Sequence, residues 1–307
     1  MNPIVCLIIA NIIWGAAAPV FKFSLSNIPP FTLAFIRFFF ASFLFLPFLR
    51  KEHFLSLNWN YFWKIILGLS VFGVFINITF FFLGLQRTES INAPVIASSG
   101  PVFLFIFSIL FLREKPKWKV LLGMMVALVG AMVIIFEPFF LGQETKIELN
   151  QLEGNFFLLL ATLGAVFYPL IIKSVLEKVN SYLVTFIGFF FGSLLFLPFV
   201  FLEFKTWNLN QLNSAGWIGI IFGVFLSSAL AYFLYSYGLS KIKTQEVGLF
   251  TYIDPVVAVI IAIPLLSEYP SILFLIGAGF VLLGIFIAEK RIHYHPFLKI
   301  KKALGSL

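Results

Sequence analysis

The sequence predicts an all-α polytopic membrane protein, with ten transmembrane helices arranged as two inverted repeats of five helices. Three observations lead to this prediction. Of the 307 residues, 61% are hydrophobic and 11% are charged, whereas a soluble domain carries about 25% charged residues. The apolar residues form stretches long enough to cross a bilayer, and the second half of the chain repeats the first. This composition excludes an ordinary soluble enzyme, a disordered chain and an outer-membrane barrel, whose strands alternate apolar and polar residues.

Apolar stretches of spanning length follow one another along the whole chain, where a membrane helix needs about 20 residues. They cover roughly residues 3–22, 31–49, 62–84, 91–112, 118–136, 154–173, 182–202, 215–238, 245–266 and 271–289. The breaks between them are short and carry prolines or charges, as at residues 27–30, 50–52 and 113–116. We therefore expect ten membrane helices that are joined by short loops.

The distribution of Lys and Arg predicts the orientation of these helices. With a cytoplasmic N-terminus, the cations on the outer side are Lys22, Arg87, Lys146 and Lys205. Apart from Arg37, which lies within a span, all other Lys and Arg residues fall on the inner side. The positive-inside rule then places both termini in the cytoplasm. The same bias accounts for the net charge of +8 without a nucleic-acid partner.

An internal duplication is the most informative feature of the sequence. The segment 38–48 returns as 189–199, and further along Trp63 matches Trp217 and Glu114 matches Glu268. Five spans per repeat is an odd number, so the second repeat must insert upside down relative to the first. Many secondary transporters have this architecture of inverted repeats.

The duplication divides the chain into four parts. Residues 1–140 form the first repeat with helices one to five, and residues 154–290 form the second with helices six to ten. An acidic linker, residues 141–153, is expected to connect them on the outside. Residues 291–307 form a basic cytoplasmic tail.

Several motifs resemble the EamA repeat of the drug/metabolite transporter superfamily. They are Trp14-Gly15, Arg37-Phe38, Pro101 followed by Glu114, and Pro255 followed by Glu268. The resemblance covers nearly the whole chain. It implies a ten-helix carrier of small metabolites in the bacterial inner membrane, often an exporter, with a central cavity between the halves. The chain departs from the family pattern at Arg113 and Ser267, where the family usually has Gly before the Glu that ends each repeat.

Asp254 is the only acidic residue deep inside a predicted span. It lies about 12 Å from the start of that span, near the midplane of a hydrocarbon core of about 30 Å. A carboxylate there costs about 2.5–3.5 kcal/mol, so we expect it to face a cavity or a partner. It would act as a proton acceptor or as a counter-ion for an amine. The alternative is a helix cap that only satisfies the interrupted backbone.

Matched helix breaks in the two repeats support a site at the midplane. Asp254 and Pro255 form a dipeptide typical of an N-cap followed by the first helical position. The corresponding place in the first repeat holds Gly100 and Pro101. Paired interruptions of this kind are typical of transporter binding sites.

Arg37 is the only cation within a predicted span, about 9 Å below its outer edge. Its counterpart in the second repeat is Gly188, so the two halves are not functionally equivalent. It would bind a carboxylate or pair with Asp254. The alternative is a structural donor to backbone carbonyls, or a side chain that reaches to the interface.

Further polar and aromatic residues within the spans are candidates for the cavity wall. They are Asn11, Trp14, Asn77, Ser98, Tyr168, Ser228, Tyr232, Tyr235 and Thr251. Aromatic walls with a few polar groups suit a small amphipathic metabolite. The alternative is that these groups only hold helices together, at about 0.6 kcal/mol per hydrogen bond. Glu114 and Glu268 are interpreted as caps or gate contacts.

Small residues in the last span of each repeat predict close helix packing. They include Gly123, Gly130, Gly277 and Gly284. A homodimer formed through such residues is a further hypothesis.

The sequence favours a secondary transporter that exports a small metabolite, such as an amino acid or a similar amphipathic compound, by alternating access. Its partners would be the substrate and the lipid bilayer, with protons open as the coupling ion. No Walker motif is present, and no cofactor or metal is expected, because all three histidines lie outside the spans. The alternatives are a membrane-embedded enzyme that modifies a lipid or isoprenoid, and a receptor that only binds. An enzyme would need a nucleophile with a base, paired acids or metal ligands, which the spans do not offer.

Overall fold

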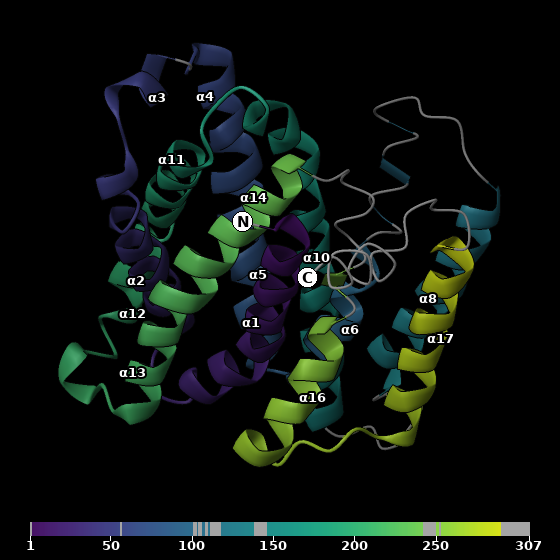
Figure 1. Ribbon diagram of the computed structural model, residues 1–307. Helices are drawn as coiled ribbons and strands as arrows, with labels where there is room; N and C mark the ends of the chain where they lie inside the picture. Colours follow the sequence, from purple (N-terminus) through teal and green to yellow (C-terminus); the bar gives the residue numbers. More distant parts are fainter. Residues whose placement is uncertain are drawn as a thin grey trace, which may run out of the picture.

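The computed structural model is all-helical, and the part of the chain that it describes contains no β-strand (Figure 1). It describes residues 2–55, 57–100, 118–137, 146–241, 250–251 and 253–289, together with Phe103, Ile106, Phe107 and Leu110. Pro101, Glu114 and the predicted basic tail lie outside the described residues.

The first half begins with two helices that start at prolines. The elements are α1 (Pro3–Ser24), α2 (Pro30–Phe43), η1 (Leu46–Phe48), α3 (Lys51–Leu55), α4 (Trp59–Ile65), η2 (Ile66–Ile76), α5 (Asn77–Leu85), α6 (Asn92–Ala97) and α8 (Trp118–Ile135). The side chain of Asn2 accepts a hydrogen bond from the Ile4 backbone N–H and so caps α1, whose first residue is Pro3. Proline is favoured there because its missing N–H would have no partner within the helix.

The second half repeats this order of elements. They are α10 (Lys146–Leu176), α11 (Ser181–Leu194), α12 (Leu197–Glu203), η3 (Leu209–Gln211), α13 (Ser214–Ile221), η4 (Phe222–Leu230), α14 (Ala231–Lys241), α16 (Ile253–Leu266) and α17 (Ile272–Glu289). The π-helical segments η2 and η4 occupy matching places in the third helix of each half. Each packs on the second helix of the other half, since α2 contacts η4 and α11 contacts η2. The duplication seen in the sequence is therefore also present in the backbone.

Long apolar helices confirm the predicted all-α membrane fold. The described residues contain 5 helices long and apolar enough to cross a membrane, or 6 if α11 and α12 form one span with a 44° bend. Shorter apolar helices follow at Met125–Ile135, Ile253–Leu266 and Ile272–Gly284. The second predicted span, 31–49, is less regular than expected, because α2 ends at Phe43 and a 3-10 turn follows.

The linker predicted at residues 141–153 is partly helical. Helix α10 begins at Lys146 and so extends the predicted span 154–173 towards the N-terminus. No proline or glycine separates Lys146 from Glu153, so nothing in this stretch interrupts a helix. Glu153 forms an ion pair with Arg87 at 3.4 Å, which connects this end of α10 to the end of α5.

The first helices of the two halves run in opposite directions. Lys22, near the end of α1, donates a hydrogen bond to the Thr88 carbonyl at 2.7 Å. The Thr88 hydroxyl donates to Asn155 Oδ1 at 2.7 Å, and Asn155 lies near the beginning of α10. The end of α1 and the beginning of α10 therefore lie at the same end of the molecule, as an inverted repeat requires.

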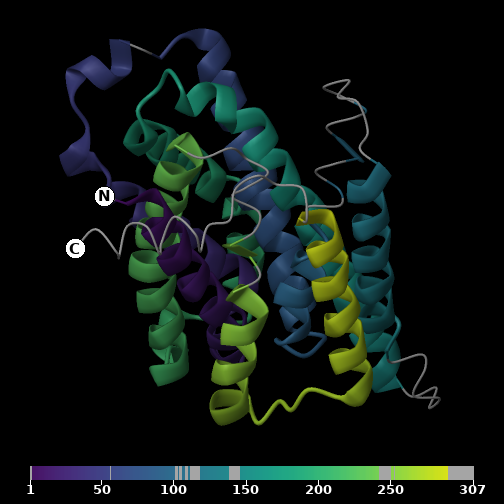
Figure 2. The same ribbon diagram turned by 45° about the vertical axis from the view of Figure 1, so that its right-hand side comes forward.

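Helices α8 and α17 form a closely packed pair at one side of the molecule (Figures 1 and 2). A Cβ atom added to Gly284 would collide with the backbone of Gly123 and Ala127, and one added to Gly130 would collide with the Gly277 carbonyl. The predicted small-residue packing thus joins two helices of one chain. The homodimer stays a prediction, and these glycines are already occupied within the chain.

A polar cluster, here called the end cluster, joins the two halves at the end where α1 finishes. Its members are Lys22, Glu89, Ser90, Glu137, Glu268 and Ser271. Lys22 pairs with Glu268 at 2.6 Å, and Glu268 also accepts from the backbone N–H and the hydroxyl of Ser90, at 2.8 and 2.6 Å. Glu268 does not cap α17, because Ser271 accepts the hydrogen bond from the Phe274 N–H. Glu268 is a contact between the halves.

Ser267 has a backbone conformation that favours glycine. Its φ is 56°, in the left-handed region, and its N–H donates to the Ile263 carbonyl at the end of α16. A side chain in this conformation costs about 1–2 kcal/mol. The glycine that the EamA pattern usually has at this position would avoid that strain.

We expect Gly284→Ala to destabilise the protein by about 1–3 kcal/mol, because the new methyl group meets backbone atoms of α8 that cannot move aside. Gly279 is the control on the same helix, since a Cβ there has no neighbour within 4 Å. Gly279→Ala should leave stability unchanged or raise it by up to about 1 kcal/mol. Thermal unfolding in detergent, followed by circular dichroism, compares the two. Equal melting temperatures would contradict the packing of α8 on α17.

We expect Ser267→Gly to stabilise the protein by about 1 kcal/mol, because glycine adopts a positive φ without strain. Ser240→Gly is the matched control, since Ser240 lies within α14, where glycine costs up to about 1 kcal/mol. Thermal unfolding should therefore move in opposite directions for the two variants. A lower melting temperature for Ser267→Gly would count against the strained conformation.

The pKa of the Glu89 carboxyl is raised above 4.5, first by burial and then by the nearby carboxylates of Glu268 and Glu137, while Lys22 opposes this shift. The unfolded chain therefore loses this proton at a lower pH than the folded protein does. It follows that Glu89 weakens the folded state increasingly as the pH rises above 4.5.

We expect Glu89→Gln to raise the melting temperature at neutral pH, with a gain that shrinks as the pH falls towards 4.5. Glu52→Gln, at an exposed glutamate of α3, controls for the loss of one negative charge. The measurement is thermal unfolding of both variants and the wild type between pH 4 and pH 8. A gain that does not depend on pH would disprove this role of Glu89.

Candidate functional site

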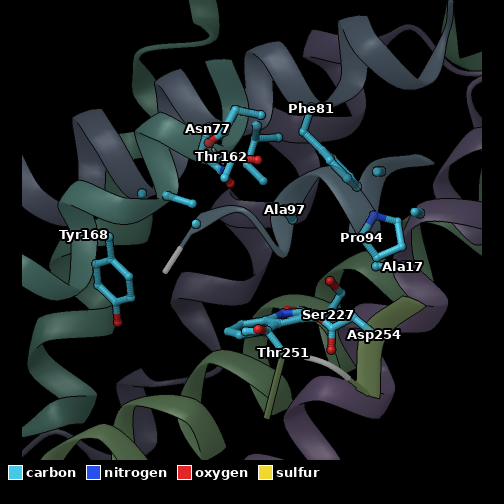
Figure 3. A pocket seen from close by; sticks show the side chains of 18 of the residues that line it. Ala17, Asn77, Phe81, Pro94, Ala97, Thr162, Tyr168, Ser227, Thr251 and Asp254 are labelled. Carbon is cyan, nitrogen blue, oxygen red and sulfur yellow. Dashed lines mark hydrogen bonds between the residues drawn. The ribbon is translucent and has the colours of Figure 1, made fainter. Parts of the chain in front are cut away.

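A cavity of about 280 Å³ lies between the two halves of the molecule. Its wall is formed by α1, α2, η2, α5, α6, α10, η4, α14 and the beginning of α16. The side chains around it are shown in Figure 3. Its volume is close to the lower limit of about 300 Å³ for ligand pockets, which suits a small molecule.

Most of the residues that the sequence singled out line this cavity. They are Trp14, Arg37, Asn77, Gly100, Tyr168, Tyr232, Tyr235, Thr251 and Asp254. Ser228 does not line it but contacts Arg37. Asn11 and Ser98 are buried elsewhere, and each donates a hydrogen bond to its own chain segment, at the Leu7 and Pro94 carbonyls.

Asp254 lies in the first turn of α16, which begins at Ile253. The sequence predicted an N-cap at Asp254 with Pro255 as the first helical residue, so the helix starts two residues earlier than expected. Its Oδ1 atom is buried and has no hydrogen-bond partner among the described residues. This oxygen therefore does not cap the helix, and the carboxyl group faces the cavity together with Thr251 (Figure 3).

Gly15 brings the beginning of α16 against α1. A Cβ atom on Gly15 would lie 2.8 Å from the Asp254 carbonyl oxygen and 2.8 Å from Val257 Cβ. The two backbones thus approach too closely for any side chain at this position. Gly15 is part of the Trp14-Gly15 motif, but its role in placing Asp254 could not be derived from the sequence, because it depends on which helix packs there.

Arg37 is almost completely buried, with 2% of its surface exposed. Its Nε donates to the Ser228 hydroxyl at 2.7 Å and its Nη2 to the Ser227 hydroxyl at 3.0 Å. The guanidinium carbon lies 4.6 Å from the ring centres of both Phe21 and Phe38. Such contacts between a cation and an aromatic ring are favourable in a site without water.

The guanidinium group of Arg37 does not form all the hydrogen bonds that it could donate. Among the described residues, its Nη1 atom has no hydrogen-bond partner, and Arg37 and Asp254 do not form an ion pair. In the described part of the chain Arg37 is thus buried and not paired with Asp254, and its role in binding a carboxylate stays a prediction. Its hydrogen bonds go to serine hydroxyls and not to backbone carbonyls.

Four aromatic side chains surround the space between these charges. The ring centre of Trp14 lies 5.1 Å from that of Tyr232 and 4.9 Å from that of Tyr235. Tyr168 lies 6.3 and 6.4 Å from the same two tyrosines. The Trp14 indole N–H donates to the Ser227 carbonyl at 3.1 Å, which orients the ring.

Asn77 links the two halves beside the cavity, because its amide donates to the Ala161 carbonyl of α10 at 2.8 Å. The sequence did not single out Ser227, which accepts from both Arg37 and Trp14. Its position directly before Ser228 was the only signal that could have indicated it. Among the described residues, no group of three or more His, Cys, Asp and Glu side chains could hold a metal ion.

Comparison with known proteins matches both halves of the chain to the same family. The model of the EamA-like transporter family matches residues 1–136 and residues 152–289. A protein of Bacillus subtilis described as uncharacterized transporter YetK is 28% identical over 94% of this chain and 86% of its own length. An uncharacterized transporter of Archaeoglobus fulgidus is 30% identical over 91% of this chain and 95% of its own length.

A solved structure, described only as the crystal structure of a protein, has a similar fold. Its TM-score is 0.64 at 16% sequence identity, over 93% of this chain and 96% of that one. The family model matches most of the chain, once in each half of the duplication. The protein therefore belongs to the EamA-like transporter family, whose fold has ten membrane helices.

Proposed function

We propose that this protein is a secondary transporter that exports a small zwitterion, such as an amino acid, through the cavity between its halves. The observation that carries the proposal is a pair of oppositely charged residues on one cavity, each with an atom that has no hydrogen-bond partner among the described residues. These atoms are Asp254 Oδ1 and Arg37 Nη1. A buried polar atom without a partner costs free energy, so a ligand that satisfies both atoms is favoured.

The chemistry of each charge indicates which group it would bind. The carboxylate of Asp254 would accept hydrogen bonds from an ammonium group, and the rings of Trp14 and Tyr235 offer it aromatic faces. The guanidinium of Arg37 is suited to a carboxylate, which it can bind with two parallel hydrogen bonds. A molecule with both groups would neutralise the two desolvated charges at once.

Transport would follow the alternating-access scheme of inverted repeats, in which the two halves rock about the central site. The end cluster supports this scheme, because its Lys22–Glu268 ion pair joins α1 of the first half to the end of α16 in the second. Opening the cavity towards this end would break that pair. Glu268 would then be a gate contact, which is one of the two roles that the sequence suggested.

We also propose where the protein lies in the cell and that it does not chemically change its substrate. The protein would lie in the inner membrane of the cell, and the excess of Lys and Arg on one side favours an orientation with both termini in the cytoplasm. The relatives are described as transporters, which agrees with a protein that moves its substrate unchanged.

Mass spectrometry of the culture medium tests the function. Bacterial cells that overexpress the wild type are compared with cells that express Asp254→Asn at a matched level. We expect one or a few amino acids to accumulate outside the cells only with the wild type. If no metabolite accumulates and purified protein in liposomes transports no amino acid, the proposed function is wrong.

We expect Arg37→Gln and Asp254→Asn each to lower amino acid transport at least about tenfold, because each leaves one end of the substrate without its charged partner. Ser98→Ala is the control within the membrane, since Ser98 is buried but does not line the cavity. The rates are measured in liposomes with equal amounts of protein. Amino acid transport retained by an Arg37→Ala, Asp254→Ala double variant would contradict the role of these charges.

A further inference from the structure

Matching positions of the two halves line the cavity, and their side chains differ in polarity. The offset of 154 residues that aligns Trp63 with Trp217 also aligns Gly100 with Asp254. The same offset aligns Ala97 with Thr251, and all four of these residues line the cavity. In each of these two pairs the first half supplies an apolar residue and the second half a polar side chain.

The third helix of each half shows the same difference. Ile78 and Phe81 are aligned with Tyr232 and Tyr235, and again all four line the cavity. Figure 3 shows Phe81 on one side of the cavity and Asp254, with Thr251, on the opposite side. Ile78 and Phe81 of the first half thus form an apolar wall, with Asn77 beside it, while their partners in the second half carry hydroxyl groups.

Arg37 and Asn77 are polar residues of the first half that also line the cavity. The surroundings of Arg37 show why it has no counterpart in the second half. Its side chain lies against Gly223 of η4. In the alignment of the two halves, Gly188 corresponds to Arg37 and Leu69 corresponds to Gly223. At this equivalent interface Gly188 lies against Leu69. Each interface therefore pairs one large residue with one glycine, but the large residue lies on α2 at one interface and on η2 at the other. The Arg37 side chain fills the space beside Gly223, and the Leu69 side chain fills the space beside Gly188.

This difference places Arg37 beside polar residues of the second half. Its hydrogen bonds go to Ser227 and Ser228 of the second half, and Trp14 also donates to Ser227. Trp14 in turn is next to Gly15, which touches Asp254. Arg37 and Asp254 are therefore linked through Ser227, Trp14 and Gly15.

We infer that the substrate binds in one orientation, with its charged groups at Arg37 and Asp254 and an apolar side chain against Ile78 and Phe81. The substrate class is then an amino acid with an aliphatic or aromatic side chain. This inference rests on the proposed function and narrows its substrate. A hydroxyl group on the substrate's side chain would be buried against the side chains of Ile78 and Phe81, which offer it no hydrogen bond.

Valine and threonine test the inference, because they have the same shape and differ by a methyl and a hydroxyl group. Binding of each is measured by calorimetry with the purified full-length protein in detergent, and transport of each is measured in liposomes. We expect valine to bind about 10- to 100-fold more tightly than threonine. Leucine should bind at least as tightly as valine.

Two variants of the apolar wall test whether it sets this preference. Phe81→Tyr and Ile78→Thr each supply a hydroxyl group, and each should lower the preference for valine over threonine at least about threefold. Phe80→Tyr is the matched control on the same helix, since Phe80 packs on Phe157 and does not line the cavity. It should leave the preference unchanged.

The outcomes separate this inference from the proposed function. Equal binding of valine and threonine, or an unchanged preference in both wall variants, would overturn the inference while the transport of amino acids stands. If the protein neither binds nor transports any amino acid, both are wrong. Preference for valine that decreases in the wall variants and not in Phe80→Tyr supports the inference.

Discussion

A charged side chain inside a membrane protein is stable only when neighbouring groups replace the water that it has lost. Arg37 shows how far this protein meets that requirement. Two serine hydroxyls and two phenylalanine rings surround its guanidinium group, yet one of its nitrogen atoms has no partner in the described part of the chain. Asp254 on the same cavity has an oxygen that is likewise unpaired among these residues, so polar atoms are left without hydrogen bonds where a ligand would bind.

Glycines at close helix contacts determine where these two charges lie. Gly15 lets the beginning of α16 approach α1, and Gly223 leaves the space that the Arg37 side chain occupies. Small residues have this effect in membranes because helix association there depends on van der Waals packing and not on the exclusion of water. Their contribution to the site is therefore indirect but specific, since a single added methyl group would displace a charged side chain or the helix that carries it.

The duplication accounts for both the symmetry of the fold and the asymmetry of the cavity. The two halves keep matching helices, matching π-helical segments and equivalent interfaces. The side chains at matching places have diverged, as Gly100 and Asp254 or Leu69 and Gly223 show. A symmetric scaffold can thus support motion about a central axis, while an asymmetric wall gives the substrate one orientation.

The sequence by itself determined the all-helical membrane fold, most of the spans, the duplication and the two charged candidates, Asp254 and Arg37. These features depend on hydrophobicity, length and charge, which are local properties of the chain. Only the tertiary structure decided that Asn11 and Ser98 lie away from the cavity, that Ser227 holds Arg37, and that Glu268 pairs with Lys22. It also decided that α10 begins at Lys146, within the predicted linker. The reason is that the direction of a side chain depends on how its helix is rotated and packed, and residues far apart in the sequence decide both.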